Sequence, residues 1–166
     1  DDRRWATSAH HIQAILDPSG KLTEGNHIFC SISGSNEVEK APKGQRTATV
    51  STHIELSNFH DLPSSKQADI VHQIQSKMQH CMEQRLPEVH QNILKIHPGS
   101  PRTFQRFTRR SGGYVGGPAR TLGWHNYKQL GPKQVLPGLW MVGDSVFPGQ
   151  STLATALGGA RTARAI

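Results

Sequence analysis

The chain has 166 residues and a formal net charge of +7, a size that fits one domain or a portion of a larger protein. It has no apolar run long enough for a membrane-spanning helix, and two cysteines are too few for a disulfide scaffold. The positive charge is concentrated in residues 101–166, which carry nine Lys and Arg residues against one acid, Asp144. Leu, Ile, Val and Phe account for only 35 residues, so we expect a small core.

The first half of the sequence is typical of antiparallel strands. Alternating apolar and polar residues predict strands over 10–16 and 27–33, with the turn sequence Asp-Pro-Ser-Gly between them. Thr and Val enrichment predicts a third strand over 46–54, because branched side chains suit a pleated surface.

A long helix follows. Apolar residues at three- and four-residue steps predict a helix over 65–86, with Ser64 and Gln67 in capping-box spacing and Pro87 after its end. Residues 90–97 are then predicted to form a strand.

Gly and Pro dominate from Pro98 onward, so we expect turns there and few regular elements. The short apolar run at 139–142 is predicted to form a strand, and Gly143 and Asp144 follow it directly. Residues 151–166, which are rich in Ala, Gly and Thr, are predicted to form a helix. Ligands of α/β folds bind where strands end and helices begin, because glycine admits a close approach and helix N–H groups attract anions. On spacing alone, an ordinary strand–loop–helix with a solvated Asp144 is equally compatible.

Residues 138–150 read GLWMVGDSVFPGQ, and this stretch resembles the carboxy-terminal flavin motif of the phytoene desaturase and carotenoid isomerase family. These proteins are FAD-dependent, amine-oxidase-like oxidoreductases. Three upstream pieces occur in the family's order: the loop APKG at 41–44, the helix at 65–86, and PRTFQRFT at 101–108 followed by GGYVGG at 112–117. The resemblance covers most of residues 27–166.

The resemblance implies an α+β fold, specifically an α/β flavoprotein fragment. Residues 1–120 would be a portion of the substrate-binding domain, built from antiparallel strands and one long helix. Residues 121–166 would be a strand–turn–helix that returns to a Rossmann-like FAD-binding domain. The family's G-x-G-x-x-G fingerprint is absent from the sequence, so the amino-terminal half of that domain is expected outside this chain. The start at Asp1 without Met also indicates a portion of a longer protein.

The implied cofactor is FAD, and the resemblance places a set of residues beside it: Gly143, Asp144, Pro148, Gly149, Gln150, Ser151 and Thr152. The carboxylate would bind the ribityl chain, and the first glycine would give the flavin room. Backbone N–H groups near the start of the helix would face the N1–C2=O edge and stabilise the negative charge of reduced flavin. Ser151 stands where many family members have Gly, and it is a good helix-capping residue. No side chain is an obvious acid or base, so no catalytic residue is assigned.

The implied activity is desaturation or cis–trans isomerisation of a carotenoid or similar polyene. The isolated fragment is expected to be inactive, and the expected location is cytoplasmic or plastid-like, at the periphery of a membrane. One alternative is a related flavoenzyme of the retinol-saturase or amine-oxidase type. An alternative from another class is a non-catalytic basic module that docks on anionic lipid or nucleic acid.

Two further groups of residues invite interpretation. The ten histidines lack metal-ligand spacing, so no metal site is expected. His125 and Tyr127 would line a substrate channel or have a structural or surface role. The basic run of Arg102, Arg106, Arg109 and Arg110, interleaved with Phe104 and Phe107, suits a peripheral membrane surface. A solvated basic face is the alternative, and nucleic acid is not expected because no recognisable reader module occurs.

Overall fold

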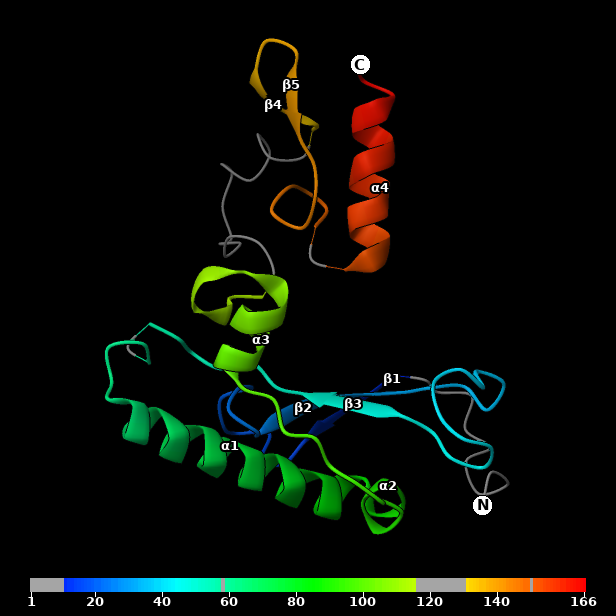
Figure 1. Cartoon of the computed structure of the whole chain (residues 1–166), viewed down its shortest axis with the longest axis vertical. Helices are drawn as coiled ribbons and strands as arrows, with labels where there is room; N and C mark the ends of the chain where they lie inside the picture. The colour runs from blue at the N-terminus through cyan, green and yellow to red at the C-terminus, as the bar shows by residue number, and fades with distance from the viewer. Residues whose placement is uncertain (1–10, 58, 116–130, 150) are drawn as a thin grey trace. The chain divides into compact units, whose positions relative to one another are not determined.

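The computed structural model describes residues 11–57, 59–115, 131–149 and 151–166, and it divides the chain into two compact units (Figure 1). Unit 1 is Asp1–Arg102 and unit 2 is Thr103–Ile166. The described residues form four α-helices and two small antiparallel sheets, so the prediction of a mixed α and β structure is confirmed. Its assignment to a flavoprotein fold, with a domain boundary at residue 120, stays a prediction.

Unit 1 is built on a three-stranded antiparallel sheet in the order β1-β2-β3. The strands are β1 (His11–Ile15), β2 (His27–Ile32) and β3 (Ala48–Ser51), which confirms the three predicted strands. The third is shorter than predicted. It ends at Ser51, because the next residue forms hydrogen bonds through its side chain instead of continuing the backbone pairing. The Thr52 hydroxyl donates to the carbonyl of His27 at 2.7 Å and accepts the N–H of Gly25 at 3.0 Å.

The connection from β1 to β2 is held by one buried side chain, Asn26. Its amide group donates to the carbonyls of Asp17 and Lys21 at 2.8 and 2.9 Å, and its oxygen accepts the Asp17 N–H at 3.0 Å. Gly25 precedes it with φ of 84°, and a Cβ there would lie 2.9 Å from the carbonyl oxygen of Ile74. This position therefore requires glycine, both for its backbone conformation and for the close approach to the following helix.

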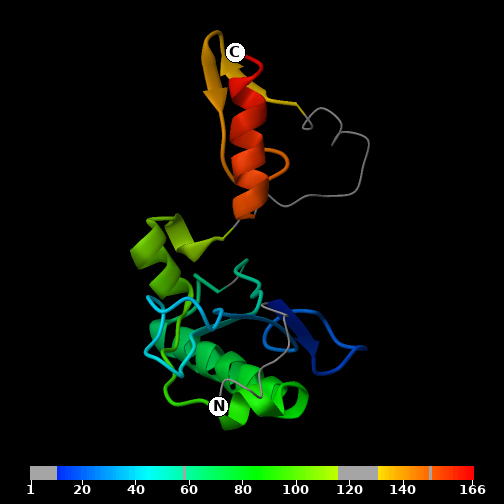
Figure 2. The ribbon, with the colours of Figure 1, turned by 90° about the vertical axis from the view of Figure 1, so that its right-hand side faces the viewer.

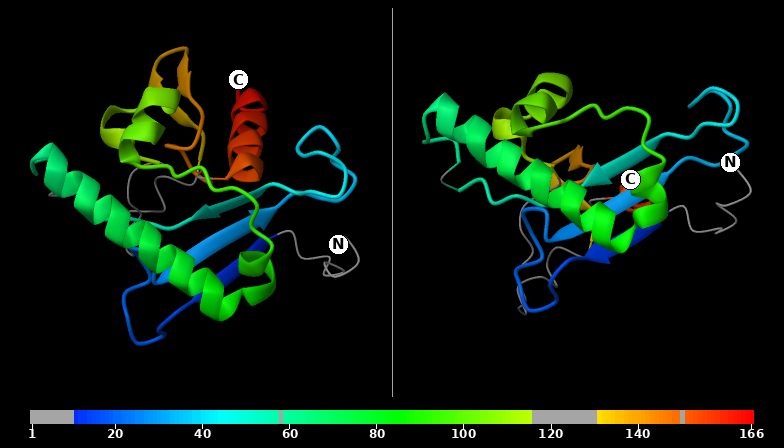
Figure 3. Two further views of the ribbon diagram at one scale, coloured as in Figure 1. Left: turned by 60° about the horizontal axis from the view of Figure 1, so that its bottom comes forward. Right: turned by 90° about the horizontal axis from the view of Figure 1, so that it is seen from below.

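The long helix α1 (Ser64–Arg85) lies across one face of this sheet, and the short helix α2 (Pro87–Gln91) follows it (Figure 3). The prediction of a helix over 65–86 is confirmed within one residue at each end. The predicted capping box is wrong, because no side chain caps the helix. The Gln67 amide instead donates to the carbonyl of Leu62 at 2.9 Å, and the Ser64 hydroxyl accepts from Arg102 at 2.8 Å.

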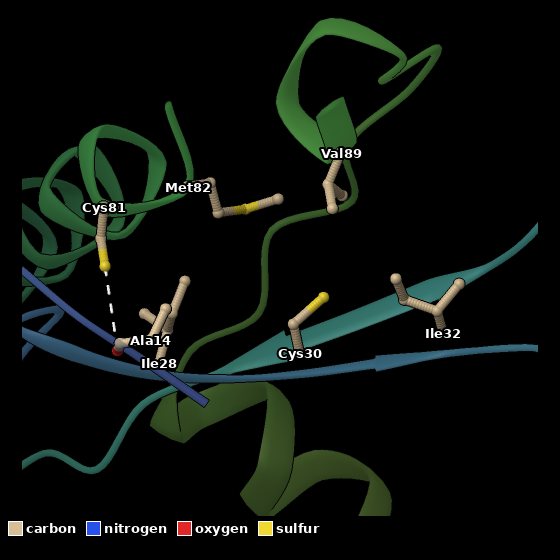
Figure 4. Packing of buried hydrophobic residues seen from close by; sticks show 7 residues of the cluster. All are labelled: Ala14, Ile28, Cys30, Ile32, Cys81, Met82 and Val89. Atoms are coloured by element: carbon tan, nitrogen blue, oxygen red, sulfur yellow. Dashed lines mark hydrogen bonds between the residues drawn. The ribbon is translucent and has the colours of Figure 1, made fainter. Parts of the chain in front are cut away.

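The core lies between the sheet and these two helices (Figure 4). Ile28, Cys30 and Cys81 are the largest fully buried side chains, and the Cys81 thiol donates to the carbonyl of Ala14 at 3.9 Å. The cluster has seven buried members, which are Ala14, Ile28, Cys30, Ile32, Cys81, Met82 and Val89. The expectation of a small core is confirmed.

The predicted strand over 90–97 is wrong. Residues 87–91 are helical, with Pro87 at the first helical position, where its missing N–H costs nothing. Residues 93–100 have no regular structure, and Leu94 and Ile96 are exposed rather than placed on a sheet. An apolar alternation predicts a strand only where a neighbouring strand is present to pair with it.

Unit 2 contains more regular structure than the abundance of Gly and Pro predicts. Helix α3 (Pro101–Thr108) begins at the end of unit 1, and the 3-10 helix η2 (Ser111–Gly113) follows. Strand β4 (Lys133–Leu136) pairs antiparallel with β5 (Leu139–Met141) around Gly138, whose φ is 76°. Of these, β5 and the final helix α4 (Thr152–Ala163) were predicted and are confirmed. Figure 2 shows α4 running alongside the hairpin.

We expect Ile28→Ala to lower the free energy of unfolding by about 2–5 kcal/mol, because the side chain is fully buried and its removal leaves a cavity. Leu94→Ala is the matched control, since that side chain is 78% exposed and should change stability by less than about 0.5 kcal/mol. Chemical denaturation measures both variants. Equal effects would contradict the position of the core.

The two buried thiols predict a pH dependence of stability. Burial raises the pKa of Cys30, and it also raises the pKa of Cys81 against the opposing charge of Arg85. The unfolded chain therefore loses these protons first. The contribution of the buried, protonated thiols to the stability of the folded state is complete below the ordinary thiol pKa of about 8.5. It is lost as the pH rises through the higher pKa values that the two thiols have in the folded chain. Denaturation curves between pH 7 and 10 should show a steeper decline for the natural chain than for the Cys30→Ala/Cys81→Ala variant. A decline of equal slope would contradict the prediction.

Candidate functional site

The segment between β5 and α4 is a tight turn that begins at Gly143. Its φ of 121° lies in the region that favours glycine, and a Cβ there would meet nothing within 4 Å, so open space lies beside the backbone. The turn closes when the Val146 N–H donates to the carbonyl of Gly143 at 3.2 Å. Val146 is buried, and so is Gly149 near the end of the turn.

Asp144 is the acid of this turn, and it is held in place by a basic residue 34 positions earlier. The Arg110 guanidinium forms an ion pair with one carboxylate oxygen, and the Ser145 hydroxyl donates to the other at 3.3 Å. The Asp144 side chain is only 27% exposed. These contacts argue against the reading of Asp144 as a solvated turn residue. A carboxylate has about four acceptor positions, so it retains capacity for further hydrogen bonds.

Helix α4 begins with a side-chain cap. Ser151 has extended backbone angles, and its hydroxyl accepts the N–H of Ala154 at 3.1 Å. The Thr155 hydroxyl donates to the Ser151 carbonyl at 2.7 Å. The capping role expected of Ser151 is confirmed, and it leaves Thr152 exposed as the first helical residue.

The start of α4 and the acid of the turn meet at one surface hollow. Its volume is about 560 Å³, and the residues that line it are Asp144, Ser151, Thr152, Thr155 and Ala156. An acceptor of hydrogen bonds and the positive end of a helix dipole therefore face the same space.

The rest of the turn is packed against α4. The Arg161 guanidinium lies 5.6 Å from the ring centroid of Phe147. A Cβ on Gly158 would lie 3.6 Å from Cδ of Pro148, an ordinary van der Waals contact. The two adjacent glycines of the helix thus have different surroundings, since Gly159 faces open space.

The structure brings together only part of the set that the sequence predicts. Asp144, Ser151 and Thr152 line the hollow, whereas Gly143, Pro148 and Gly149 lie in the turn and do not. Gln150, like His125 and Tyr127, lies outside the described residues. Sequence reasoning missed Thr155 and Ala156, which helical periodicity places one turn after the predicted positions, and it placed Arg110 on a basic surface rather than beside Asp144.

Neither a metal cluster nor a spanning helix is found in the described part of the chain. No group of three or more His, Cys, Asp or Glu side chains there has the geometry of a metal site. The described helices are also too short or too polar to cross a bilayer.

The donor set at the hollow fits part of a flavin cofactor. A polyol chain needs acceptors for its hydroxyl groups, which the Asp144 carboxylate offers. An electron-rich ring edge needs N–H donors, which the start of α4 offers, and the open space beside Gly143 admits a close neighbour.

The chain is 27% identical over 163 residues to a chloroplastic prolycopene isomerase of Arabidopsis thaliana. It is 26% identical over 162 residues to chloroplastic prolycopene isomerase 1 of an Oncidium hybrid cultivar. It is 25% identical over 170 residues to a chloroplastic prolycopene isomerase of Daucus carota. The predicted resemblance is confirmed.

Each of these similarities covers 96% of this chain, whereas the chain spans only 27% of the length of the Arabidopsis relative. No protein-family model matches the chain, and no solved structure matches it. The similarity to prolycopene isomerases is therefore a similarity to one portion of longer proteins.

We expect Arg110 and Asp144 to stabilise unit 2 as a pair. In a double-mutant cycle with Arg110→Gln and Asp144→Asn, the coupling free energy should be about 0.5–1 kcal/mol, because both side chains are partly exposed. Arg109→Gln is the matched control, since it removes the same charge one residue away and should show no coupling to Asp144. Chemical denaturation measures all variants, and equal coupling for both arginines would contradict a specific ion pair.

Proposed function

We propose that this chain is a portion of an FAD-dependent oxidoreductase that acts on a carotenoid or similar polyene, by desaturation or cis–trans isomerisation. The observation that carries the proposal is the shared hollow of Asp144 and the start of α4, at the stretch that resembles the family's flavin motif. The similarity to prolycopene isomerases over 96% of the chain supports it and favours isomerisation. It also favours a plastid location, since these relatives are named chloroplastic.

Two residues of the hollow, Asp144 and Ser151, have definite tasks in this proposal. Asp144 accepts hydrogen bonds from the hydroxyl groups of the ribityl chain, and its ion pair with Arg110 orients the carboxylate. Ser151 orders the first turn of α4, so that its backbone N–H groups stay directed at an anionic ring edge. When bound, FAD would supply the redox chemistry, and the chain would bind and orient it.

The proposal also assigns a partner to the exposed apolar side chains of unit 2. Leu139 on β5 and Leu153 and Leu157 on α4 are 54%, 81% and 48% exposed. Val146 is the one buried apolar residue in the described part of this unit. Side chains of this kind pack when a further part of the protein covers them. We propose that the amino-terminal portion of the longer protein does so and completes the FAD site. The isolated chain should then bind FAD poorly and be inactive.

The test uses the full-length protein that contains this chain. After reconstitution with FAD it should show flavin absorbance in the visible spectrum and convert a polyene, as followed by chromatography of the product. Asp144→Ala should weaken flavin retention roughly tenfold or more, because a hydrogen bond to a charged group is lost. Glu55→Ala is the control, since Glu55 is an exposed acid of unit 1 and should leave retention unchanged.

Two results would contradict the proposal. Absence of flavin absorbance after reconstitution would exclude the flavoenzyme. Unchanged flavin retention in Asp144→Ala would mean that the hollow is not part of the cofactor site.

A further inference from the structure

The segment that follows α2 turns back beside the first half of α1 and is fixed to it at two points (Figure 3). The Gln75 amide donates to the carbonyl of Gly99 at 2.9 Å, and the Arg102 guanidinium donates to the hydroxyl of Ser64 at 2.8 Å. Eleven residues, about three helical turns, separate the two contact points on α1. Residues 99–102 are therefore held against a defined stretch of the helix.

A pocket with a volume of about 400 Å³ lies at this junction, and Ser64, Gln75 and Arg102 line it. From α1 it is also lined by Ala68 and Val71, and steps of three and four residues from 64 to 75 place these side chains on one face of the helix. All of its lining residues belong to unit 1. The residues of α1 that pack into the core come from its last turns, so the pocket is not part of the core. Its volume is within the range of about 300–1,000 Å³ that is typical of small-molecule sites.

Two buried apolar side chains lie at this pocket. Phe59 is 5% exposed and Pro101 is buried, and both line the pocket together with Val71. An apolar group that enters would leave water for a surface that water itself solvates poorly. The pocket therefore suits a ligand with an apolar body.

The polar side of the pocket is basic. Arg102 is exposed, and its contact with the uncharged Ser64 hydroxyl leaves the guanidinium charge unneutralised. A guanidinium has several N–H donors in a planar fork, and this contact uses one of them. Among the described residues, no carboxylate pairs with Arg102, and none of those that line the pocket is Asp or Glu. A negatively charged ligand would therefore meet no competing acid there.

His72 adds a second polar group to the same pocket. The Ser76 hydroxyl lies 3.3 Å from its Nδ1 atom, one turn further along α1. When this hydroxyl donates to Nδ1, the hydrogen of the neutral imidazole lies on Nε2. The ring then has an N–H donor for a ligand.

We propose that this pocket binds a small organic carboxylate with an apolar body. Arg102 would pair with the carboxylate through its remaining N–H donors, and His72 would donate from Nε2. Phe59, Val71 and Pro101 would contact the apolar body. The contact with Ser64 holds the guanidinium at the edge of the pocket, which lowers the entropy cost of the pairing.

The charge of the pocket favours a carboxylate over a phosphate. A carboxylate has one negative charge and two oxygens that match the fork of a single guanidinium. A phosphate monoester has a charge of about −1.5 to −2 at pH 7 and three strong acceptor oxygens, so it would need more donors than Arg102 and His72 supply. This inference stands apart from the proposed flavin site, since none of these residues lines the hollow at Asp144.

The test is an NMR titration of the 166-residue chain with hydrocinnamate, a carboxylate that has an aromatic body. It should bind saturably. Acetate lacks the apolar body and hydrocinnamyl alcohol lacks the charge, so each should bind at least about tenfold more weakly. Arg102→Gln should weaken the affinity for hydrocinnamate about tenfold or more. Lys66→Gln is the matched control, because it removes an equal charge from an exposed position of α1 that does not line the pocket.

A second variant tests the pocket without changing its charge. Ala68 is an exposed helical residue that lines the pocket, so Ala68→Leu should narrow the site and weaken binding several-fold while the chain stays folded. Ala160→Leu is the matched control, since Ala160 is an exposed alanine of α4 that lines neither pocket. Both controls should bind hydrocinnamate like the natural chain, and circular dichroism checks that every variant is folded.

Several outcomes would overturn the proposal. No saturable binding at millimolar concentrations would exclude the site. Equal affinity for hydrocinnamyl alcohol would exclude recognition of the charge, and equal affinity for acetate would exclude a role for the apolar side chains. Unchanged affinity in Arg102→Gln, or equal losses in the controls, would place the binding elsewhere. Tighter binding of inorganic phosphate than of hydrocinnamate would identify a phosphate site instead.

Discussion

The packing of α1 against β2 is the contact on which unit 1 depends. Ile28 and Cys30 from the strand meet Cys81 and Met82 from the last turns of the helix. A cluster this small limits the stabilisation available from apolar burial, so the remaining geometry has to be fixed by hydrogen bonds. Buried polar side chains do this: Asn26 closes the first connection with three hydrogen bonds, and the Thr52 hydroxyl ends the third strand. The order of unit 1 therefore comes from a small core together with well-satisfied polar groups.

Unit 2 is organised differently, because its described residues contain almost no core. The Arg110–Asp144 ion pair, the Ser151 cap and the stacking of Arg161 on Phe147 hold the turn and the helix in place. Polar contacts of this kind are directional, and they place the carboxylate and the helix start at one hollow with little buried apolar surface. They also leave the leucines of β5 and α4 exposed, which is the arrangement expected of a segment that completes its core with another part of a longer protein.

Local patterns in the sequence predicted the elements that depend on local physics. Alternation predicted the first two strands of unit 1, Thr and Val enrichment predicted the third, and apolar spacing predicted α1. The Ser151 cap was expected from residue type alone. The failures involve distant partners. Residues 90–97 alternate like a strand, yet Leu94 and Ile96 are exposed, and that outcome depends on strands elsewhere. Gln67 has capping-box spacing but bonds the preceding carbonyls. The Arg110–Asp144 pair spans 34 residues, and no spacing rule distinguishes Arg110 from the other cations nearby.

The uneven charge of the chain has a structural consequence at this pair. Residues 101–166 contain one acid, so one of the nine basic residues there has a carboxylate of its own segment to bind. The structure shows Arg110 in that role, which separates it from Arg102, Arg106 and Arg109. A basic run that is continuous in sequence is thereby divided in two. Its last member, Arg110, orients the partly buried Asp144 carboxylate. The others lie on or directly after the exposed helix α3, which also carries Phe104 and Phe107. One acidic residue thus distinguishes Arg110, which has a carboxylate partner, from the other three arginines of the run, which have none among the described residues.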